Sequence, residues 1–192
     1  QILQNANFVP SVLNIQNAGF MAGGQFGYNW QREGMLLGVE GDMDYAAIGG
    51  ANNATMAAAI ATTVDNNLNW LATLRARMGK LASENTLVYV TAGPAFGEEK
   101  LTFDHRYPAM NPGFSVRTAA SQTKTKAGWT VGGGVEYAVW QRATFKAEYL
   151  YVDLGRMNLN ALGSFAGVIP VDYQVSSKFN NNLLRLGINY KI

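Results

Sequence analysis

Apolar and polar residues alternate along most of this chain with a period of two. From Phe20 to Trp30 every second residue is aromatic, apolar or small, and the residues between them are small or polar. At the other end of the chain, the alternate residues from Leu184 to Ile192 are all apolar or aromatic. This periodicity predicts β-strands with two different faces. Seven such runs occur, at about 19–30, 35–45, 69–79, 86–97, 126–137, 142–153 and 183–192.

The connections between these runs alternate in length. Short links are expected at 31–34, 80–85 and 138–141, and long ones at about 46–68, 98–125 and 155–182. Transmembrane β-barrels of bacterial outer membranes have this organisation, with tight periplasmic turns and long extracellular loops. The pattern therefore predicts a single all-β domain, an antiparallel up-and-down barrel, over residues 1–192.

Two features indicate that the apolar face points outward, toward lipid. Runs of about ten to twelve residues are long for a soluble protein but match a tilted strand that crosses a bilayer. Aromatic residues also cluster near the ends of the runs, as a membrane interface selects. One predicted girdle contains Phe20, Tyr45, Trp70, Phe96, Trp129, Tyr149 and Tyr151, and the other contains Tyr28, Trp30, Tyr137 and Tyr190. The alternative is a soluble lipocalin-like barrel, which would place its apolar face inside.

The number of runs is odd, whereas single-chain bacterial barrels have an even number of strands. Residues 1–18 are rich in Asn and Gln and fall where an external loop is expected. We therefore expect a further strand before Gln1, in an eight-stranded barrel. Pro94 removes a ladder hydrogen bond within its run, so we expect a bulge there, or a strand that has nearly left the sheet.

Composition agrees with a barrel and excludes other classes. The 192 residues include 21 glycines and no cysteine, with 11% aromatic and 15% charged residues and a net charge of +2. This charge is too small to indicate a nucleic-acid partner. No thiolate metal site or disulfide framework can form. The N-terminus has no signal-peptide pattern, so we expect a mature form whose signal peptide has been removed, a truncated form, or an intracellular protein.

Several of these segments resemble the small surface-antigen barrels of alphaproteobacteria, typified by the major outer-membrane antigens of Brucella. The resemblance covers every predicted strand in order: GFMAGGQFGYNWQ, MLLGVEGDMDY, WLATLRARMGKL, LVYVTAGPAFG, KAGWTVGGGVEYA, FKAEYLYVDLG and LLRLGINYKI. It implies an eight-stranded outer-membrane barrel of the porin family, with extracellular loops and a periplasmic C-terminus.

Charged residues on the inner face of the predicted barrel are balanced in number, four acidic and four basic. A barrel of eight strands is only wide enough for side chains to fill it. Charges buried there must be paired, because an isolated one is costly. We expect structural ion pairs across neighbouring strands, formed by Glu40, Asp42, Arg75, Arg77, Glu136, Lys146, Glu148 and Arg185.

No enzymatic site is predicted. His105 is the sole histidine, in the second expected long loop, and a base needs a partnered nucleophile or acid. We expect it at the surface. Neither a metal site nor a cofactor is expected, although some relatives are reported to bind haem. Haem ligands from the loops would be His105, Tyr107, Met110 and Met56.

The leading functional expectation is a structural protein of the outer membrane. It would support envelope integrity and display surface loops, with a lumen plugged by ion pairs. The alternatives are a surface haem receptor and a narrow porin of low conductance. The expected partners are outer-membrane lipid and lipopolysaccharide, together with envelope or surface proteins.

Overall fold

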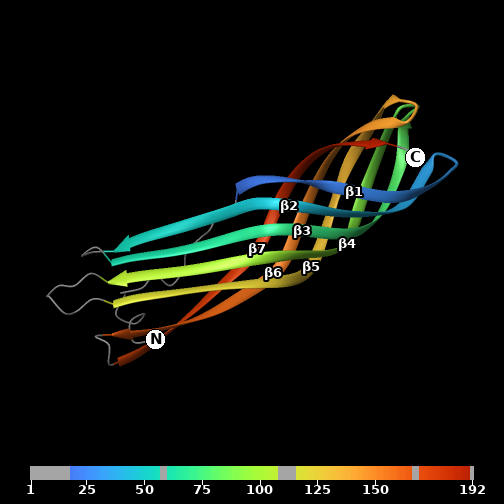
Figure 1. The fold of residues 1–192 in the computed structure, drawn as a ribbon. Helices are drawn as coiled ribbons and strands as arrows, with labels where there is room; N and C mark the ends of the chain where they lie inside the picture. The colour runs from blue at the N-terminus through green and yellow to red at the C-terminus, as the bar shows by residue number, and fades with distance from the viewer. Residues whose placement is uncertain (1–17, 57–59, 108–115, 166–168, 191–192) are drawn as a thin grey trace.

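The fold is one antiparallel sheet of seven strands, arranged in chain order (Figure 1). The computed structural model describes residues 18–56, 60–107, 116–165 and 169–190. The strands are β1 (Ala18–Arg32), β2 (Met35–Met56), β3 (Ile60–Ser83), β4 (Thr86–Tyr107), β5 (Val116–Trp140), β6 (Ala143–Phe165) and β7 (Ile169–Tyr190). The predicted all-β, up-and-down topology is confirmed. No helix capable of crossing a membrane occurs in the described ranges.

Three two-residue turns, at 33–34, 84–85 and 141–142, lie at one end of the sheet, here named the turn end. In the first of them Glu33 and Gly34 have φ values of 53° and 80°. Two successive positive φ angles are required by the hairpin turn whose twist matches that of the flanking strands. The opposite end of the sheet is named the open end. The loop predicted at 1–18 falls, apart from Ala18, outside the described residues.

At the open end the strands continue well beyond the predicted boundaries. Most of the long loops expected at 46–68, 98–125 and 155–182 are strand, with register pairs such as Asn52–Val64, Phe103–Ala120 and Leu159–Val175. The predicted loop boundaries are therefore wrong.

Irregularities in β3 and β6 explain part of this error, for the loops expected at 46–68 and 155–182, whereas the β4–β5 ladder across 98–125 has no register shift. The register shifts between Leu68 and Trp70, and again between Asp153 and Gly155. Each shift inserts one residue, so the inward positions of β3 change from odd to even numbers and those of β6 from even to odd. An alternation traced along the sequence loses its phase at these positions.

Beyond the shift in β6 the sheet divides into two layers. The β5–β6 ladder runs only from the pair Trp129–Asp153 to the turn end. From there to the open end β5 pairs with β4 alone, and β6 pairs with β7 alone, so that two groups of strands diverge in Figure 1. The β6–β7 ribbon packs on the inner face of the other group, where Asn66 Nδ2 donates to Ser177 Oγ over 3.0 Å.

The interior contains a layer of apolar side chains between the middle of the sheet and its open end. Its members are Ala46, Ile48, Leu68, Leu71, Ala95, Leu150, Val152, Leu154, Phe179 and Leu183. The outer face is also apolar, and many of its large side chains are more than half exposed, among them Phe26, Met43, Leu74, Val90 and Leu186. An apolar surface of this extent is what a surrounding membrane would cover.

Pro94 neither bulges nor leaves the sheet, so that expectation is wrong. Its ladder to β5 is continuous, while the ladder to β3 is interrupted between the pairs Thr73–Ala95 and Ala76–Ala92 and resumes in the same register. Gly93 accommodates the close approach, because a Cβ there would lie 2.0 Å from the Leu74 carbonyl oxygen. The sheet therefore tolerates the loss of the backbone hydrogen bond at Pro94 without a change of register.

Candidate functional site

A network of charged side chains occupies the inner face of the sheet, between the turn end and the apolar layer. All eight residues predicted from the sequence belong to it. Three of their pairs are direct register neighbours, Glu40–Arg75, Glu136–Lys146 and Glu148–Arg185. Of the eight, only Arg185 retains notable exposure, with 13% of its side chain accessible.

Arg75 lies at the centre of the network, and its side chain is fully buried. Its Nη2 lies 2.5 Å from Glu40 Oε1 and 2.8 Å from Asp42 Oδ2. Its Nη1 lies 2.9 Å from Glu148 Oε2. The planar guanidinium can contact several carboxylates at once because its donors point in fixed, diverging directions.

Arg77 and Lys146 contact carboxylates that are not always their register neighbours. Arg77 Nη1 lies 3.2 Å from Glu40 Oε2, and Nη2 lies 2.7 Å from Glu136 Oε1. Lys146 Nζ lies 2.6 Å from Glu40 Oε1 and 3.3 Å from Glu148 Oε1. Glu136 therefore pairs with Arg77, on a strand that is not its neighbour, although Lys146 is opposite it in the ladder.

Asp44 is a fifth carboxylate, and the sequence analysis missed its role. It is 4% exposed and forms an ion pair with Nη2 of Arg185. The other terminal nitrogen of Arg185, Nη1, lies 3.1 Å from Asp42 Oδ1. The described network thus has five carboxylates and four cations. In the alternation of β2, Asp44 stands on the same face as Glu40 and Asp42. This shared face could have assigned Asp44 to the network from the sequence.

Neutral polar side chains complete the network. Tyr89 Oη donates to Glu148 Oε1 over 2.9 Å, and its ring lies 4.0 Å from the guanidinium carbon of Arg77. Thr73 Oγ1 donates to Asp42 Oδ2 over 2.6 Å. The sequence analysis did not single out either partner, although Thr73 stands on the same face of β3 as Arg75 and Arg77.

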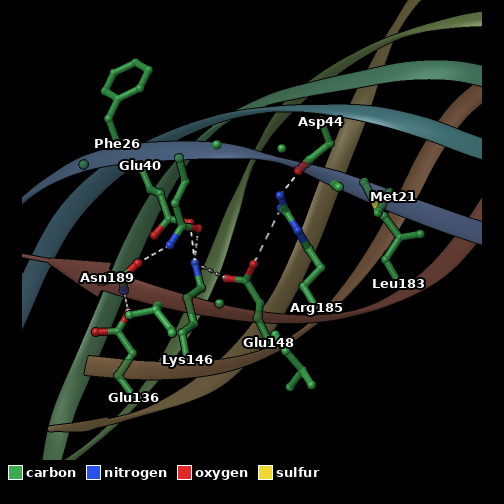
Figure 2. A pocket seen from close by; sticks show the side chains of 18 of the residues that line it. Met21, Phe26, Glu40, Asp44, Glu136, Lys146, Glu148, Leu183, Arg185 and Asn189 are labelled. Atoms are coloured by element: carbon green, nitrogen blue, oxygen red, sulfur yellow. Dashed lines mark hydrogen bonds and ion pairs between the residues drawn. The ribbon is translucent and has the colours of Figure 1, made fainter. Parts of the chain in front are cut away.

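A cavity of about 1250 Å³ lies beside this network and is lined largely by the edge strands β1 and β7. Figure 2 shows Lys146, Glu148 and Arg185 pointing into it from one side, with β1 passing across. Lys146 Nζ donates to Gln25 Oε1 over 3.0 Å, and Gln25 Nε2 donates to Asn189 Oδ1. No ladder joins β1 to β7 among the described strands. The expected eighth strand stays a prediction, and these two edges are where it would pair.

His105 lies inside β4 rather than in a surface loop, so the predicted location is wrong. Its side chain is 2% exposed, its Nδ1 lies 2.8 Å from Thr62 Oγ1, and its ring stacks on Phe103. Burial lowers the pKa of this imidazole, an effect that the charge of Asp104 opposes. The other haem ligands named above, Tyr107, Met110 and Met56, have side chains outside the described part. No group of three or more His, Asp or Glu side chains that could hold a metal ion occurs among the residues described.

All the residues of the two predicted aromatic girdles stand on the outer face. Tyr45 and Trp70 are register partners on the open-end side of the apolar band, and the Trp129 and Tyr151 rings lie 5.4 Å apart on the same side. On the turn-end side, the Tyr28 and Trp30 rings pack edge to face, with centroids 4.8 Å apart. An apolar band between two aromatic rows, around a charged interior, is the arrangement of an outer-membrane barrel.

Comparison with known proteins agrees with that class. The family model for the outer membrane protein beta-barrel domain matches residues 3–191, and the chain belongs to this family. It is 38% identical to the 31 kDa outer-membrane immunogenic protein of Brucella melitensis, over 95% of this chain and 70% of that protein.

Two further relatives are more distant. The 22 kDa outer membrane protein of Rhizobium leguminosarum is 30% identical, over 88% of this chain and 65% of the relative. The 25 kDa outer-membrane immunogenic protein of Brucella abortus is 26% identical, over 94% of this chain and 70% of the relative. No solved structure matches the chain significantly.

Proposed function

We propose that this chain is a structural, non-enzymatic protein of the outer membrane that contributes to envelope integrity and displays its open end at the cell surface. In this proposal the turn end faces the periplasm, since tight turns lie on that side in barrels of this kind. The outer apolar band contacts membrane lipid, and at the open end these contacts include lipopolysaccharide.

The observation that carries the proposal is the buried ion-pair network. Each charged side chain of the described network has at least one oppositely charged partner, on a neighbouring or a distant strand, which supports a structural role for these residues. Breaking such a pair is strongly destabilising, because the remaining charge stays buried. The network therefore supports a lumen that is closed and rigid rather than conducting.

A second candidate function, a narrow porin of low conductance, is favoured by the cavity beside β1 and β7. A haem receptor has less support, because His105 is buried and its Nδ1 lies 2.8 Å from Thr62 Oγ1.

Two measurements on the full-length protein test the proposal. A closed barrel keeps its backbone groups paired and resists detergent, so mobility in SDS should differ before and after boiling. In planar bilayers the same preparation should show negligible current. Unchanged mobility of folded protein would refute the membrane barrel. Steady ion-selective currents that persist in Arg75→Ala would refute the closed lumen and favour the porin.

A further inference from the structure

One edge of β5 has no partner strand between the open end and Gly128 (Figure 1). The β5–β6 ladder ends at the pair Trp129–Asp153, although β5 itself begins at Val116. On its other side β5 pairs with β4 continuously from Val116 to Tyr137. Among the described strands, residues 116–128 therefore have a hydrogen-bonded neighbour on one side only. Their other side is named the free edge.

The free edge exists because β6 turns toward the interior. A Cβ at Gly128 would lie 2.0 Å from the Asp153 carbonyl oxygen, so β6 passes directly beneath this glycine. Gly155 has a φ of 77°, which glycine adopts readily, and its N–H donates to Asp153 Oδ1 over 2.8 Å. Beyond this point β6 pairs with β7 alone. The separation of β5 from β6 is therefore fixed by a bulge and not by fraying of a strand end.

The odd-numbered residues of β5 direct their backbone groups to the free edge. Within a strand, the N–H and C=O groups of successive residues point alternately to its two sides. Ala138 N donates to Asn85 O over 2.8 Å, and the unbroken register extends this assignment of even-numbered residues to β4 along the whole strand. Pro94 agrees, since it has no N–H and stands opposite the odd-numbered Trp129 in an uninterrupted ladder. The odd-numbered residues thus present N–H and C=O groups that no described strand pairs with.

The free edge lacks several features that keep natural edge strands unpaired. Such strands are short, or carry bulges, prolines or charges. Residues 116–128 contain no proline, and their ladder to β4 has no bulge. The odd-numbered side chains beside the free groups are small or hydroxyl-bearing, and those described are all exposed: Ala119, Ser121, Thr123, Thr125 and Ala127. Threonine also favours strand pairing, because its branched side chain packs well on a pleated surface.

Two lysines restrict which strand can be added. Lys124 and Lys126 stand on the even-numbered, inward side of β5, and Lys124 is exposed. Inward charges on an edge oppose pairing with an apolar strand. A basic strand would be repelled, whereas an acidic side chain beside Lys124 would be favourable. A second copy of β5 fits poorly, because residues 117–128 include three basic residues and no acidic one.

The free edge lies beyond the aromatic row at the open-end side. Trp129 belongs to that row, and interfacial aromatic residues mark the level of the lipid headgroups. Thr123 stands roughly 20 Å further along the strand, at 3.4 Å per residue. A strand paired around Thr123 would therefore be surrounded by water and not by acyl chains.

We propose that the free edge of β5 binds an extended segment of a partner protein outside the cell, which adds to the sheet as a further strand. The segment carries polar and acidic side chains and no basic ones. Backbone hydrogen bonds to the odd-numbered residues supply the affinity, as in other cases of strand addition, and Lys124 selects the charge. Only the location of the partner outside the cell rests on the proposed function, which places the open end at the cell surface.

The test measures binding of a fluorescein-labelled peptide of about ten residues, the length of a long strand, to the full-length protein in detergent micelles. The peptide alternates threonine and glutamate. One control peptide has the same sequence with every second backbone nitrogen methylated, which keeps the charge but prevents pairing. A second control replaces glutamate by lysine. Binding is followed by fluorescence anisotropy.

Two variants of the protein separate the backbone from the side chains. Thr123→Pro with Thr125→Pro removes two free N–H groups, at positions where proline is tolerated because the ladder to β4 does not use them. Thr123→Val with Thr125→Val is the matched control, since valine has a similar shape and keeps both N–H groups. If the double proline variant does not fold, Thr123→Pro is compared with Thr123→Val.

The wild type and the valine variant should bind the threonine–glutamate peptide, and the double proline variant should bind it about tenfold more weakly. Neither control peptide should bind. The inference is overturned if the wild type does not bind, if the methylated peptide binds equally well, or if proline has no effect.

Amide hydrogen exchange tests the free edge directly. Without peptide, the amides of Thr123 and Thr125 should exchange faster than that of Lys124, and the peptide should slow them. Equal protection of all three without peptide means that the edge is already occupied, which overturns the inference. The occupant is then a second copy if the protein is dimeric by native mass spectrometry, and β6 if it is monomeric.

Peptide binding to intact cells that produce the protein separates the two levels of failure. Binding to the purified protein and to intact cells supports both proposals. Binding to the purified protein and to permeabilised cells alone contradicts the orientation in the proposed function and the external partner, while the pairing edge stands. Absence of binding to purified protein that keeps its heat-modifiable mobility contradicts only the inference.

Discussion

Arg75 and Glu148 form an ion pair across the interior of the sheet, with 2.9 Å between Nη1 and Oε2 and no exposure of either side chain. They belong to β3 and β6, which β4 and β5 separate in the sheet. The pair forms because the sheet curves until β3 and β6 face each other across its inner side. It therefore links two strands that share no ladder, in a sheet whose described strands stay unpaired between β1 and β7.

The Arg75→Ala variant should lose about 3–5 kcal/mol of stability, because several carboxylates lose their shared partner while remaining buried. Adding Glu148→Ala should recover part of the loss, since the variant then has one fewer unpaired charge. Urea titration of folded protein in detergent measures both. If the double variant is less stable than Arg75→Ala by the full cost of Glu148→Ala alone, the two residues are not coupled.

Substitution of Ala76 or Val131 by Arg should cost about 2–4 kcal/mol near the middle of the membrane. Both residues are exposed on the outer face, between the aromatic rows. Ala119→Arg, on the outer face beyond the open-end row, is the matched control and should cost little. Refolding into lipid vesicles under urea measures the difference. Equal effects at the three positions would mean that lipid does not surround this band.

The stability of the open end should depend on His105 as the pH falls. Burial lowers the pKa of this imidazole, so the folded protein favours its neutral form. The free energy of unfolding should be unaffected by this residue above its ordinary pKa of about 6.5 and decline below it, by at most about 1.4 kcal/mol per pH unit. His105→Gln should remove this decline. Thermal unfolding of the wild type and of His105→Gln, followed by circular dichroism from about pH 7.5 to about pH 5, tests this expectation. Identical pH profiles of the two proteins would contradict it.

The effect of Glu99 on stability should have the opposite dependence on pH. Its carboxyl is fully buried beside Asn66, and burial raises its pKa, while Asn66 and Lys126 lower it. Its contribution to stability is therefore greatest below the ordinary pKa of a glutamate and is lost as pH rises. Glu99→Gln should stabilise the protein at neutral pH and leave it unchanged at acidic pH. A variant less stable than the wild type at neutral pH would contradict this expectation.

A cysteine pair can test the eighth strand, because the chain has no cysteine of its own. Phe26→Cys on β1 and Ile188→Cys on β7 both lie on the exposed outer face. With a strand between β1 and β7 their Cα atoms would be about 10 Å apart, beyond the reach of a disulfide. Oxidation of the folded full-length protein should therefore give no crosslink. Efficient crosslinking would mean that seven strands close directly.

The sequence by itself determined the class of fold and the two faces of the strands. Period-two alternation from Phe20 to Trp30, with aromatic residues at the ends of the runs, has a local cause: successive side chains of a strand point to opposite faces. The eight predicted charges could be assigned to the inner face for the same reason. The face to which a side chain points depends on its neighbours in the sequence, so it can be predicted without the tertiary structure.

Only the tertiary structure decided which charges meet and where the strands end. Glu136 pairs with Arg77 rather than with its ladder neighbour Lys146, because the curved sheet brings distant strands within reach of long side chains. The bulge at Leu68–Trp70 reverses the phase of alternation, so the sequence predicts a loop where β3 in fact continues. His105 is buried for a related reason, since the β6–β7 ribbon covers an inner face that no local pattern marks as covered.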